Sequence, residues 1–248
     1  MNDRYACKAD ACSATVTSMS RRELITRATV AAAAASALGL TGLGTALGAE
    51  GDAAPAAAAP TTPDEALQEL TEGNKRFVEG RTTSARRDLE RLKQIAEKQT
   101  PFASILGCAD SRVPVEILYD QGFGDLFVVR VAGNVATSVE IASLEFGSAV
   151  LGAKAVLVLG HSNCGAVKAA LAGKAVPGQI STLFQHIVPA LDRKNPDVDA
   201  ACKANVAFQA RKLKEGSPVL GSLIKQGKLK IVGGFYDLST GTVTPVPV

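Results

Sequence analysis

The chain has 248 residues, of which 46% are hydrophobic and 21% are charged, and its formal net charge is +3. This composition is that of an ordinary globular protein long enough to bury a substantial core, and it excludes a disordered or fibrous chain. The charges are nearly balanced and no stripe of Lys and Arg is interleaved with aromatic residues, so a nucleic-acid partner is not expected.

The N-terminal segment has the layout of an export signal. The run Ser20-Arg-Arg-Glu-Leu-Ile25 precedes an uncharged stretch over residues 28–49, and Ala/Pro-rich sequence continues to Pro60. We interpret residues 1–59 as a twin-arginine signal peptide and linker, followed by a catalytic domain over residues 60–248. This interpretation predicts export to the cell envelope or the exterior. Met19 is an alternative native start.

Two other interpretations of this segment stay open. The paired arginines could be a plain basic flank, and the uncharged stretch is long enough to span a bilayer as a retained anchor. Its high Ala and Gly content makes it only weakly hydrophobic, however. We therefore expect no stable membrane insertion once the signal is removed.

The remaining sequence alternates helical and strand patterns, and no internal repeat is visible. Pro63 and two acids open a first helix, and Leu89, Leu92 and Ile95 form the apolar stripe of a second. Strands are predicted from short apolar runs, and prolines mark an edge strand. The predicted helices cover residues from 63 onward, 86–98, 138–151, 166–171, 178–191 and 198–213, and the predicted strands cover 102–107, 126–131, 155–160, 229–237 and 241–248. This order predicts an α/β fold with a central, mostly parallel β-sheet of four strands plus an edge strand, flanked by helices.

Two short motifs, each directly after an apolar strand, carry metal-binding side chains. Cys108 and Asp110 follow the first predicted strand, and His161 and Cys164 follow the third. In open α/β sheets, active sites gather at the carboxyl ends of the strands. Zinc prefers thiolate and imidazole ligands, and a catalytic site has three protein ligands and an open position. We therefore predict a zinc site formed by Cys108, His161 and Cys164, with Cys164 at a helix N-terminus that favours its thiolate.

These motifs resemble those of the β-class carbonic anhydrases. The matching segments, in order, are Cys108-Ala-Asp-Ser-Arg-Val-Pro114, Phe127-Val-Val-Arg-Val-Ala-Gly-Asn134 and Gly160-His-Ser-Asn-Cys-Gly165. The resemblance extends from Pro63 to the C-terminus. It implies a Zn²⁺ enzyme that hydrates carbon dioxide reversibly to bicarbonate and a proton by means of zinc-bound hydroxide. It also implies a homodimer or homotetramer whose N-terminal helices extend onto a partner subunit.

The resemblance gives roles to Asp110 and Arg112. Two thiolates cancel the charge of Zn²⁺, so its bound water should be less acidic than at an all-histidine site. In similar proteins the carboxylate either pairs with the arginine and accepts a hydrogen bond from the hydroxide, or becomes a fourth zinc ligand and blocks catalysis. We predict that Asp110 is this gate and that Arg112 holds it open through a bidentate pair.

Three further residues are interpreted through the same resemblance. Gln99 stands where similar members carry a glutamine that donates an amide hydrogen bond to the substrate, and the alternative is an exposed residue that ends a helix before Pro101. Phe127 either lines an apolar carbon dioxide pocket or packs in the core. The chain has no Trp, and Ile105 stands where some bacterial members use one to build an inhibitory bicarbonate site. Gln99 and Ile105 together favour a constitutively open subtype.

Alternative functions share the same motifs. The scaffold could hydrolyse carbonyl sulfide or carbon disulfide, or it could be a non-catalytic protein that binds zinc or bicarbonate. A structural zinc site requires four permanent ligands, and Asp110 is the only local candidate for the fourth.

The other cysteines fit the predicted export route. Cys7 and Cys12 lie in the predicted signal, and Cys202 is expected to be a small, buried apolar residue on a helix. Unmetallated thiolates are exposed to oxidation outside the cell. We therefore predict that zinc is loaded before export.

Overall fold

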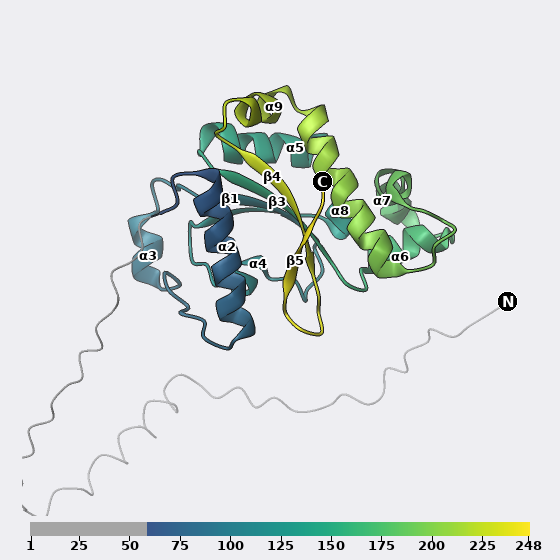
Figure 1. The fold of residues 1–248 in the computed structure, drawn as a ribbon, viewed down its shortest axis with the longest axis horizontal. Helices are drawn as coiled ribbons and strands as arrows, with labels where there is room; N and C mark the ends of the chain where they lie inside the picture. The colour runs from purple at the N-terminus through teal and green to yellow at the C-terminus, as the bar shows by residue number, and fades with distance from the viewer. Residues whose placement is uncertain (1–58) are drawn as a thin grey trace, which may run out of the picture. The chain divides into compact units, whose positions relative to one another are not determined.

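A five-stranded β-sheet forms the centre of the computed structural model, which describes residues 59–248 (Figure 1). The strands are β1 (Ala103–Gly107), β2 (Leu126–Arg130), β3 (Ala155–His161), β4 (Lys230–Tyr236) and β5 (Val243–Val246). Their order across the sheet is β2-β1-β3-β4-β5, and only β5 pairs in the antiparallel direction. The predicted α/β class, with four parallel strands and one edge strand, is confirmed.

Helices connect the strands and cover both faces of the sheet. They are α2 (Pro63–Val78), α3 (Leu89–Gln94), α4 (Val115–Leu118), α5 (Ser138–Glu145), α6 (Gly165–Ala172), α7 (Ser181–Ile187), α8 (Val198–Gly216) and α9 (Pro218–Lys225). Four short 3-10 or π-helical segments join them: η1 (Ala132–Asn134), η2 (Phe146–Val150), η3 (Gly178–Ile180) and η4 (Val188–Ala190). The first helix begins as predicted, because Thr62 and Glu65 form a reciprocal capping box just ahead of it.

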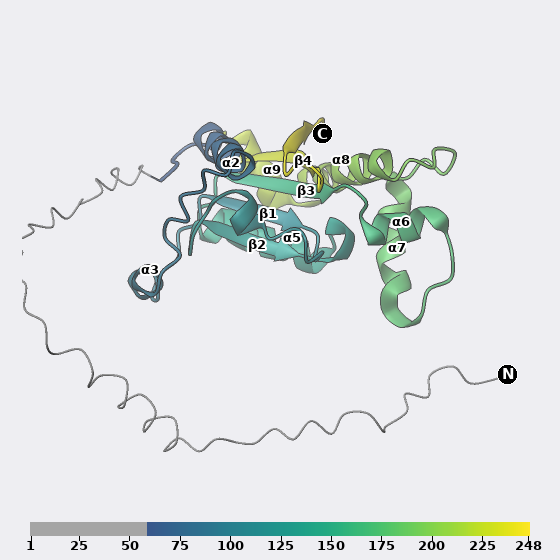
Figure 2. The same ribbon diagram turned by 90° about the horizontal axis from the view of Figure 1, so that it is seen from below.

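Alternation along the strands divides the buried side chains into two cores. In β3, Leu157 and Leu159 belong to a cluster beneath α2, whereas Val156 and Val158 belong to a cluster shared with α5, α6 and α8. Every residue of β1 and β3 is buried, as expected for parallel strands covered on both faces. In Figure 2 the sheet is seen nearly edge-on, and α2 and α5 lie on opposite sides of it.

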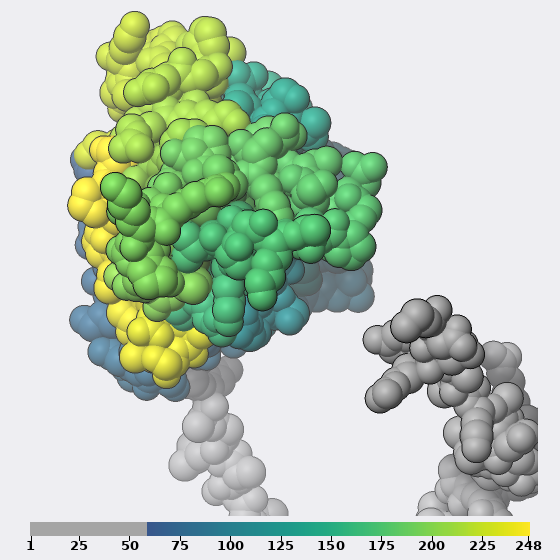
Figure 3. Space-filling model, turned by 90° about the vertical axis from the view of Figure 1, so that its right-hand side faces the viewer, coloured from purple at the N-terminus to yellow at the C-terminus, as the bar shows by residue number. Residues whose placement is uncertain are grey.

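The layout places α6 and α7 at the carboxyl end of β3. Gly165 begins α6 four residues after the last residue of that strand. In Figure 3 the green residues that include α6 and α7 cover much of the face turned to the viewer. These helices therefore stand over the sheet edge where the predicted metal ligands gather.

The second predicted helix is shorter than expected. Within residues 86–98 only Leu89–Gln94 is helical, and none of its residues is buried. Leu89 is 65% exposed and Leu92 is 44% exposed. The predicted apolar stripe therefore has little to pack against within one chain, and tertiary packing is what normally stabilises so short a helix.

Two other helix predictions need correction, and two helices, α4 and α9, were not predicted. The predicted helix over 138–151 changes from α5 into the π-helical η2, and the one over 178–191 is divided among η3, α7 and η4. The helix α9 was not predicted at all. Its signal was Ser217-Pro218, because the Ser217 hydroxyl accepts a hydrogen bond from Leu220 N–H as an N-cap, and proline suits the first helical position.

The predicted signal peptide and linker, residues 1–59, lie almost entirely outside the described residues. In the part of the chain that the structure describes, no helix is both long and apolar enough to cross a membrane.

Candidate metal centre

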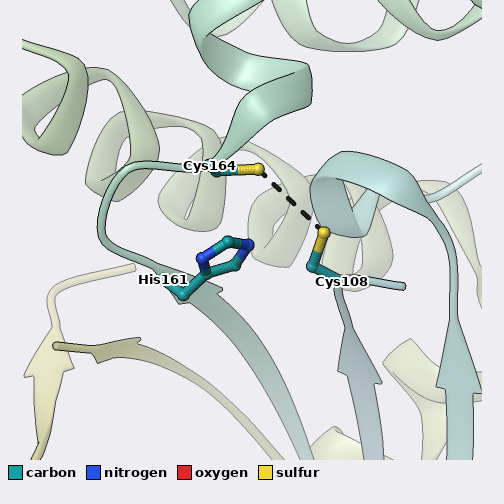
Figure 4. Close-up of side chains that lie close together, drawn as sticks. All are labelled: Cys108, His161 and Cys164. Atoms are coloured by element: carbon teal, nitrogen blue, oxygen red, sulfur yellow. Dashed lines mark hydrogen bonds between the residues drawn. The ribbon is translucent and has the colours of Figure 1, made fainter. Parts of the chain in front are cut away.

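Three buried side chains meet at the carboxyl ends of two neighbouring strands. Cys108 directly follows β1, His161 is the last residue of β3, and Cys164 is the N-cap residue of α6. Their potential ligand atoms all lie within 4.8 Å of one another. Figure 4 shows the two sulfurs and the imidazole ring converging on a common space. The structure thus brings together the three residues predicted to bind zinc, and the predicted position of Cys164 at a helix N-terminus is confirmed.

The histidine is oriented as a metal ligand. His161 Nδ1 lies 3.0 Å from the carbonyl oxygen of Ser162, an acceptor, so Nδ1 carries the proton and donates this hydrogen bond. The other ring nitrogen, Nε2, is buried and has no hydrogen-bond partner. A buried nitrogen lone pair without a partner is costly. Its placement beside two thiols is explained if it binds a metal ion.

The two sulfurs are also placed to bind a cation. Cys108 Sγ lies 4.0 Å from Cys164 Sγ, and the hydrogen bond with Cys164, together with burial, raises the pKa of Cys108 to about 12. Two thiolates this close repel each other when no positive charge lies between them. Two sulfurs and one imidazole nitrogen are the donor set that Zn²⁺ prefers, so the residues present fit the predicted ion.

Asp110 borders this space and is held by Arg112. The guanidinium donates from Nε to Asp110 Oδ1 at 2.9 Å and from Nη2 to Oδ2 at 2.8 Å, and the Arg112 backbone N–H donates to Oδ1 at 3.0 Å. The side-chain hydrogen bonds from Arg112 hold the pKa of Asp110 well below its usual range. Asp110 therefore stays ionised, and its oxygens can only accept hydrogen bonds.

Arg130 also organises the site, a role not predicted from the sequence. Its Nε donates to the carbonyl oxygen of Cys108 at 3.0 Å, and its Nη2 donates to that of Asp110 at 2.6 Å. These bonds fix the loop that carries both side chains. The available signal was the position of Arg130 at the end of β2, which neighbours β1 at the same sheet edge.

Gln99 lies at the other end of the sheet from the ligands. It precedes β1, whereas Cys108 follows it, and a strand advances roughly 3.3 Å per residue. Gln99 is exposed and lines a surface cavity with Val150 and Leu151. Within one chain, Gln99 is therefore not brought to the three ligands.

Phe127 is half-buried at the edge of the sheet, whereas Cys202 is buried. The ring centroid of Phe127 is 6.2 Å from that of Phe146, and a methyl group added to Gly147 would come within 2.8 Å of the Phe127 ring. Phe127 is nevertheless only half-buried and belongs to neither core cluster, and Phe146 is 47% exposed. Phe127 therefore packs at the edge of the sheet rather than in the core, and its role at a carbon dioxide pocket stays a prediction. Cys202 is 2% exposed on α8, as predicted.

Comparison with known proteins gives the same family from three directions. The family model described as "Carbonic anhydrase" matches residues 103–243. Carbonic anhydrase 2 of Mycobacterium tuberculosis is 39% identical over 189 residues, which cover 73% of this chain and 91% of that protein. The carbonic anhydrase of Mycolicibacterium smegmatis is 36% identical over 191 residues, which cover 74% and 93% of the two chains.

Solved structures agree with the sequence relatives. The β-carbonic anhydrase CcaA has a TM-score of 0.57 and 27% identity, and the match covers 72% of this chain and 86% of that one. The Coccomyxa β-carbonic anhydrase in complex with acetazolamide also has a TM-score of 0.57 and 27% identity, with coverage of 73% and 86%. Together with the buried Cys108, His161 and Cys164 cluster, these matches show that the chain belongs to the β-class carbonic anhydrase family.

Proposed function

We propose that the chain catalyses the reversible hydration of carbon dioxide to bicarbonate and a proton, with Zn²⁺ held by Cys108, His161 and Cys164. The observation that carries this proposal is the unpartnered Nε2 of His161, which is buried beside two thiols and next to an ionised carboxylate. When bound, zinc supplies a Lewis acid that makes a water molecule a nucleophile near neutral pH.

Asp110 orients the nucleophile in this proposal. Because its carboxylate is ionised and can only accept, a hydroxyl group beside it must turn its hydrogen toward Asp110 and its lone pairs toward the substrate. Asp110 Oδ2 lies 3.9 Å from His161 Nε2, so the carboxylate borders the space between the ligands. The bidentate bonds from Arg112 keep Asp110 in this orientation and out of the fourth ligand position.

The site favours an open catalytic centre over a closed structural one. Among the described residues, the group that could hold a metal contains only Cys108, His161 and Cys164, and a closed zinc site needs four permanent ligands. Asp110 has both oxygens bonded to Arg112. The relatives reported above are named carbonic anhydrases, and hydrolysis of carbonyl sulfide or carbon disulfide gains no support from them.

Stopped-flow hydration of carbon dioxide by the purified protein, with a parallel zinc assay, tests this function. We expect turnover in proportion to zinc content, and parallel assays on carbonyl sulfide and carbon disulfide should give far slower rates. A zinc-loaded protein without carbon dioxide hydration would contradict the proposal.

A second copy of the chain completes the assembly in this proposal. Three apolar side chains on α5 and η2 are strongly exposed: Val139 at 69%, Phe146 at 47% and Val150 at 67%. We call these three residues the α5 face. The adjacent strand β2 is a sheet edge, and none of its residues is buried: the first four are half-buried and Arg130 is exposed. An apolar helix face beside an unpaired strand edge is typical of a subunit interface.

This assembly also gives Gln99 a role. The cavity that Gln99 lines includes Val150, so it adjoins the α5 face. A subunit that covers this face would lie next to Gln99, which could then donate its amide hydrogen bond to substrate in the partner's site but not in its own. The exposed Leu89 and Leu92 of α3 are available for the same interface.

Export by the twin-arginine route is the last part of the proposal, and it rests on Arg21 and Arg22 ahead of the uncharged stretch. Replacing both with Lys should leave active protein in the cytoplasm, whereas unchanged export would refute the route. Zinc-loaded protein recovered from an export-blocked strain would support metal loading before export, and apo protein there would overturn it.

A further inference from the structure

A buried chain of amide groups runs from helix α8 to the sulfur of Cys108. Asn205 and Gln209 lie one helical turn apart on α8, and each has 0% of its surface exposed. Gln209 Nε2 donates to Asn205 Oδ1 at 3.0 Å, and Asn205 Nδ2 donates to the carbonyl oxygen of Gly133 at 2.8 Å. The N–H of the same glycine donates to Cys108 Sγ at 3.3 Å.

The direction of every bond in this chain is fixed. Gln209 Oε1 accepts from Ala136 N–H at 3.0 Å, so its Nε2 must be the group that faces the carbonyl oxygen of His186, at 2.7 Å, and Asn205 Oδ1. Asn205 Oδ1 is thereby an acceptor, and its Nδ2 is left to donate to Gly133. Both amides are held in one orientation by backbone groups on either side.

Gly133 is the point where the chain meets the metal site. Its φ of 75° lies in the left-handed region, and a methyl group added there would come within 2.8 Å of Ile187 Cδ1. A positive φ favours glycine, but it does not by itself aim the N–H. The bond from Asn205 to the Gly133 carbonyl oxygen supplies the restraint that keeps the N–H on Cys108 Sγ.

We propose that Asn205 and Gln209 are positioning residues for Cys108, acting through the backbone of Gly133. A hydrogen bond to a thiolate stabilises its charge and withdraws electron density from the sulfur, which makes it a weaker donor to a metal ion. The weaker donation matters most at a site with two thiolates, because their two negative charges otherwise cancel the charge of the metal ion. The inference rests on the zinc site of the proposed function.

Cobalt substitution tests this role, because the absorption bands of bound Co²⁺ depend on electron donation from the sulfur. The full chain is loaded with Co²⁺, and its visible and near-ultraviolet sulfur-to-cobalt absorption is compared between the wild type, Asn205→Leu and Gln209→Leu. We expect the charge-transfer bands to shift in both variants. Zinc release to a chromogenic chelator should become slower in both variants, because a sulfur that accepts one hydrogen bond fewer is a stronger donor to the metal. Outer hydrogen-bond partners typically alter metal affinity by roughly 10- to 100-fold.

Leu213→Ala is the matched control, because Leu213 is fully buried on the same helix and belongs to the apolar core. It should lower thermal stability and leave the cobalt spectrum and the zinc release rate at wild-type values. The double variant of Asn205 and Gln209 should shift the bands no further than the larger single variant, since the two amides act in series. If Asn205→Leu does not fold, Asn205→Ser keeps a polar group but is too short to reach Gly133, and it should shift the bands as well.

The outcomes separate this inference from the zinc site itself. Wild-type protein that binds neither Zn²⁺ nor Co²⁺ would refute the site. Bound cobalt whose spectrum is the same in the wild type and all amide variants would overturn the positioning role and leave the site intact.

Discussion

Asp110 Oδ2 lies 3.9 Å from Nε2 of His161, and that nitrogen is buried without a hydrogen-bond partner. The carboxylate is thus close enough to meet a ligand bound between the three metal-binding side chains, yet it is held by Arg112, two residues after it in the sequence. The gate proposed for this family member therefore depends on the geometry of one guanidinium group.

Arg112→Lys should lower the rate of carbon dioxide hydration by about 10- to 100-fold. Lysine keeps the positive charge but cannot make the two parallel hydrogen bonds that hold both Asp110 oxygens. Stopped-flow rates and zinc content should be measured together, with Arg211→Lys, an exposed arginine on α8, as the control. Full turnover in the Arg112 variant with zinc retained would contradict the gate.

Removing the metal should destabilise the folded protein. The ligands come from the ends of β1 and β3 and the start of α6, so the ion joins elements that are distant in the sequence, and binding energy adds to folding energy. Thermal unfolding after chelation should occur about 10 °C lower than with saturating zinc.

Cysteine variants distinguish a ligand from a packed thiol. Cys164→Ser should lose most of the bound zinc and gain no stability when zinc is added, because a serine hydroxyl is a poor zinc ligand. Cys202→Ala changes a buried cysteine outside the ligand cluster and should retain stoichiometric zinc. Equal zinc content in the two variants would argue against the assigned ligand set.

The zinc ligands and the sheet could be predicted from sequence because both depend on local patterns. Apolar runs mark β1 and β3, and Cys108 and His161 lie at the ends of these strands. Their placement follows from the local sequence and does not depend on distant contacts. The hydrogen bond between Asn205 and Gly133 joins residues 72 apart in the sequence, and no local sequence pattern predicts it. Contacts of this kind appear only when α8 is packed against the sheet.

Asp120 is predicted to be the most stabilising carboxylate of the N-terminal part of the fold. Its side chain is fully buried and accepts hydrogen bonds from Arg76 Nε at 2.8 Å, Thr83 N–H at 2.9 Å and Ser84 N–H at 3.0 Å. Asp120→Ala should lower the free energy of unfolding by about 3 kcal/mol, because it leaves these donors without a partner. Asp64→Ala removes an exposed ion pair with Lys230 and should cost about 0 to 1 kcal/mol.

The contribution of Asp120 should depend on pH. Burial alone would raise the pKa of Asp120, but the hydrogen bonds from Thr83 and Arg76 outweigh it and hold that pKa below its usual value. A lowered folded-state pKa stabilises the protein above the unfolded pKa, which is about 3.9, and this stability is lost as the pH falls through the folded value. Denaturant titrations should therefore show the difference between wild type and Asp120→Ala shrinking below about pH 4. A difference that is constant from pH 7 to pH 3 would contradict this ionisation.

The α5 face should control assembly. Phe146→Glu places a charge among Val139 and Val150, the other exposed apolar residues of that face. If a second copy covers it, burying that charge should weaken association at least about tenfold, and sedimentation should show a shift toward monomer. Ile180→Glu, at an equally exposed isoleucine in η3, should leave the assembly unchanged.

The same assembly should affect catalysis, because Gln99 adjoins the α5 face. Monomeric Phe146→Glu protein should bind zinc normally but hydrate carbon dioxide more slowly. Gln99→Ala in the intact oligomer should slow hydration without loss of zinc. A fully active monomer would show that neither Gln99 of a partner nor the second copy is required.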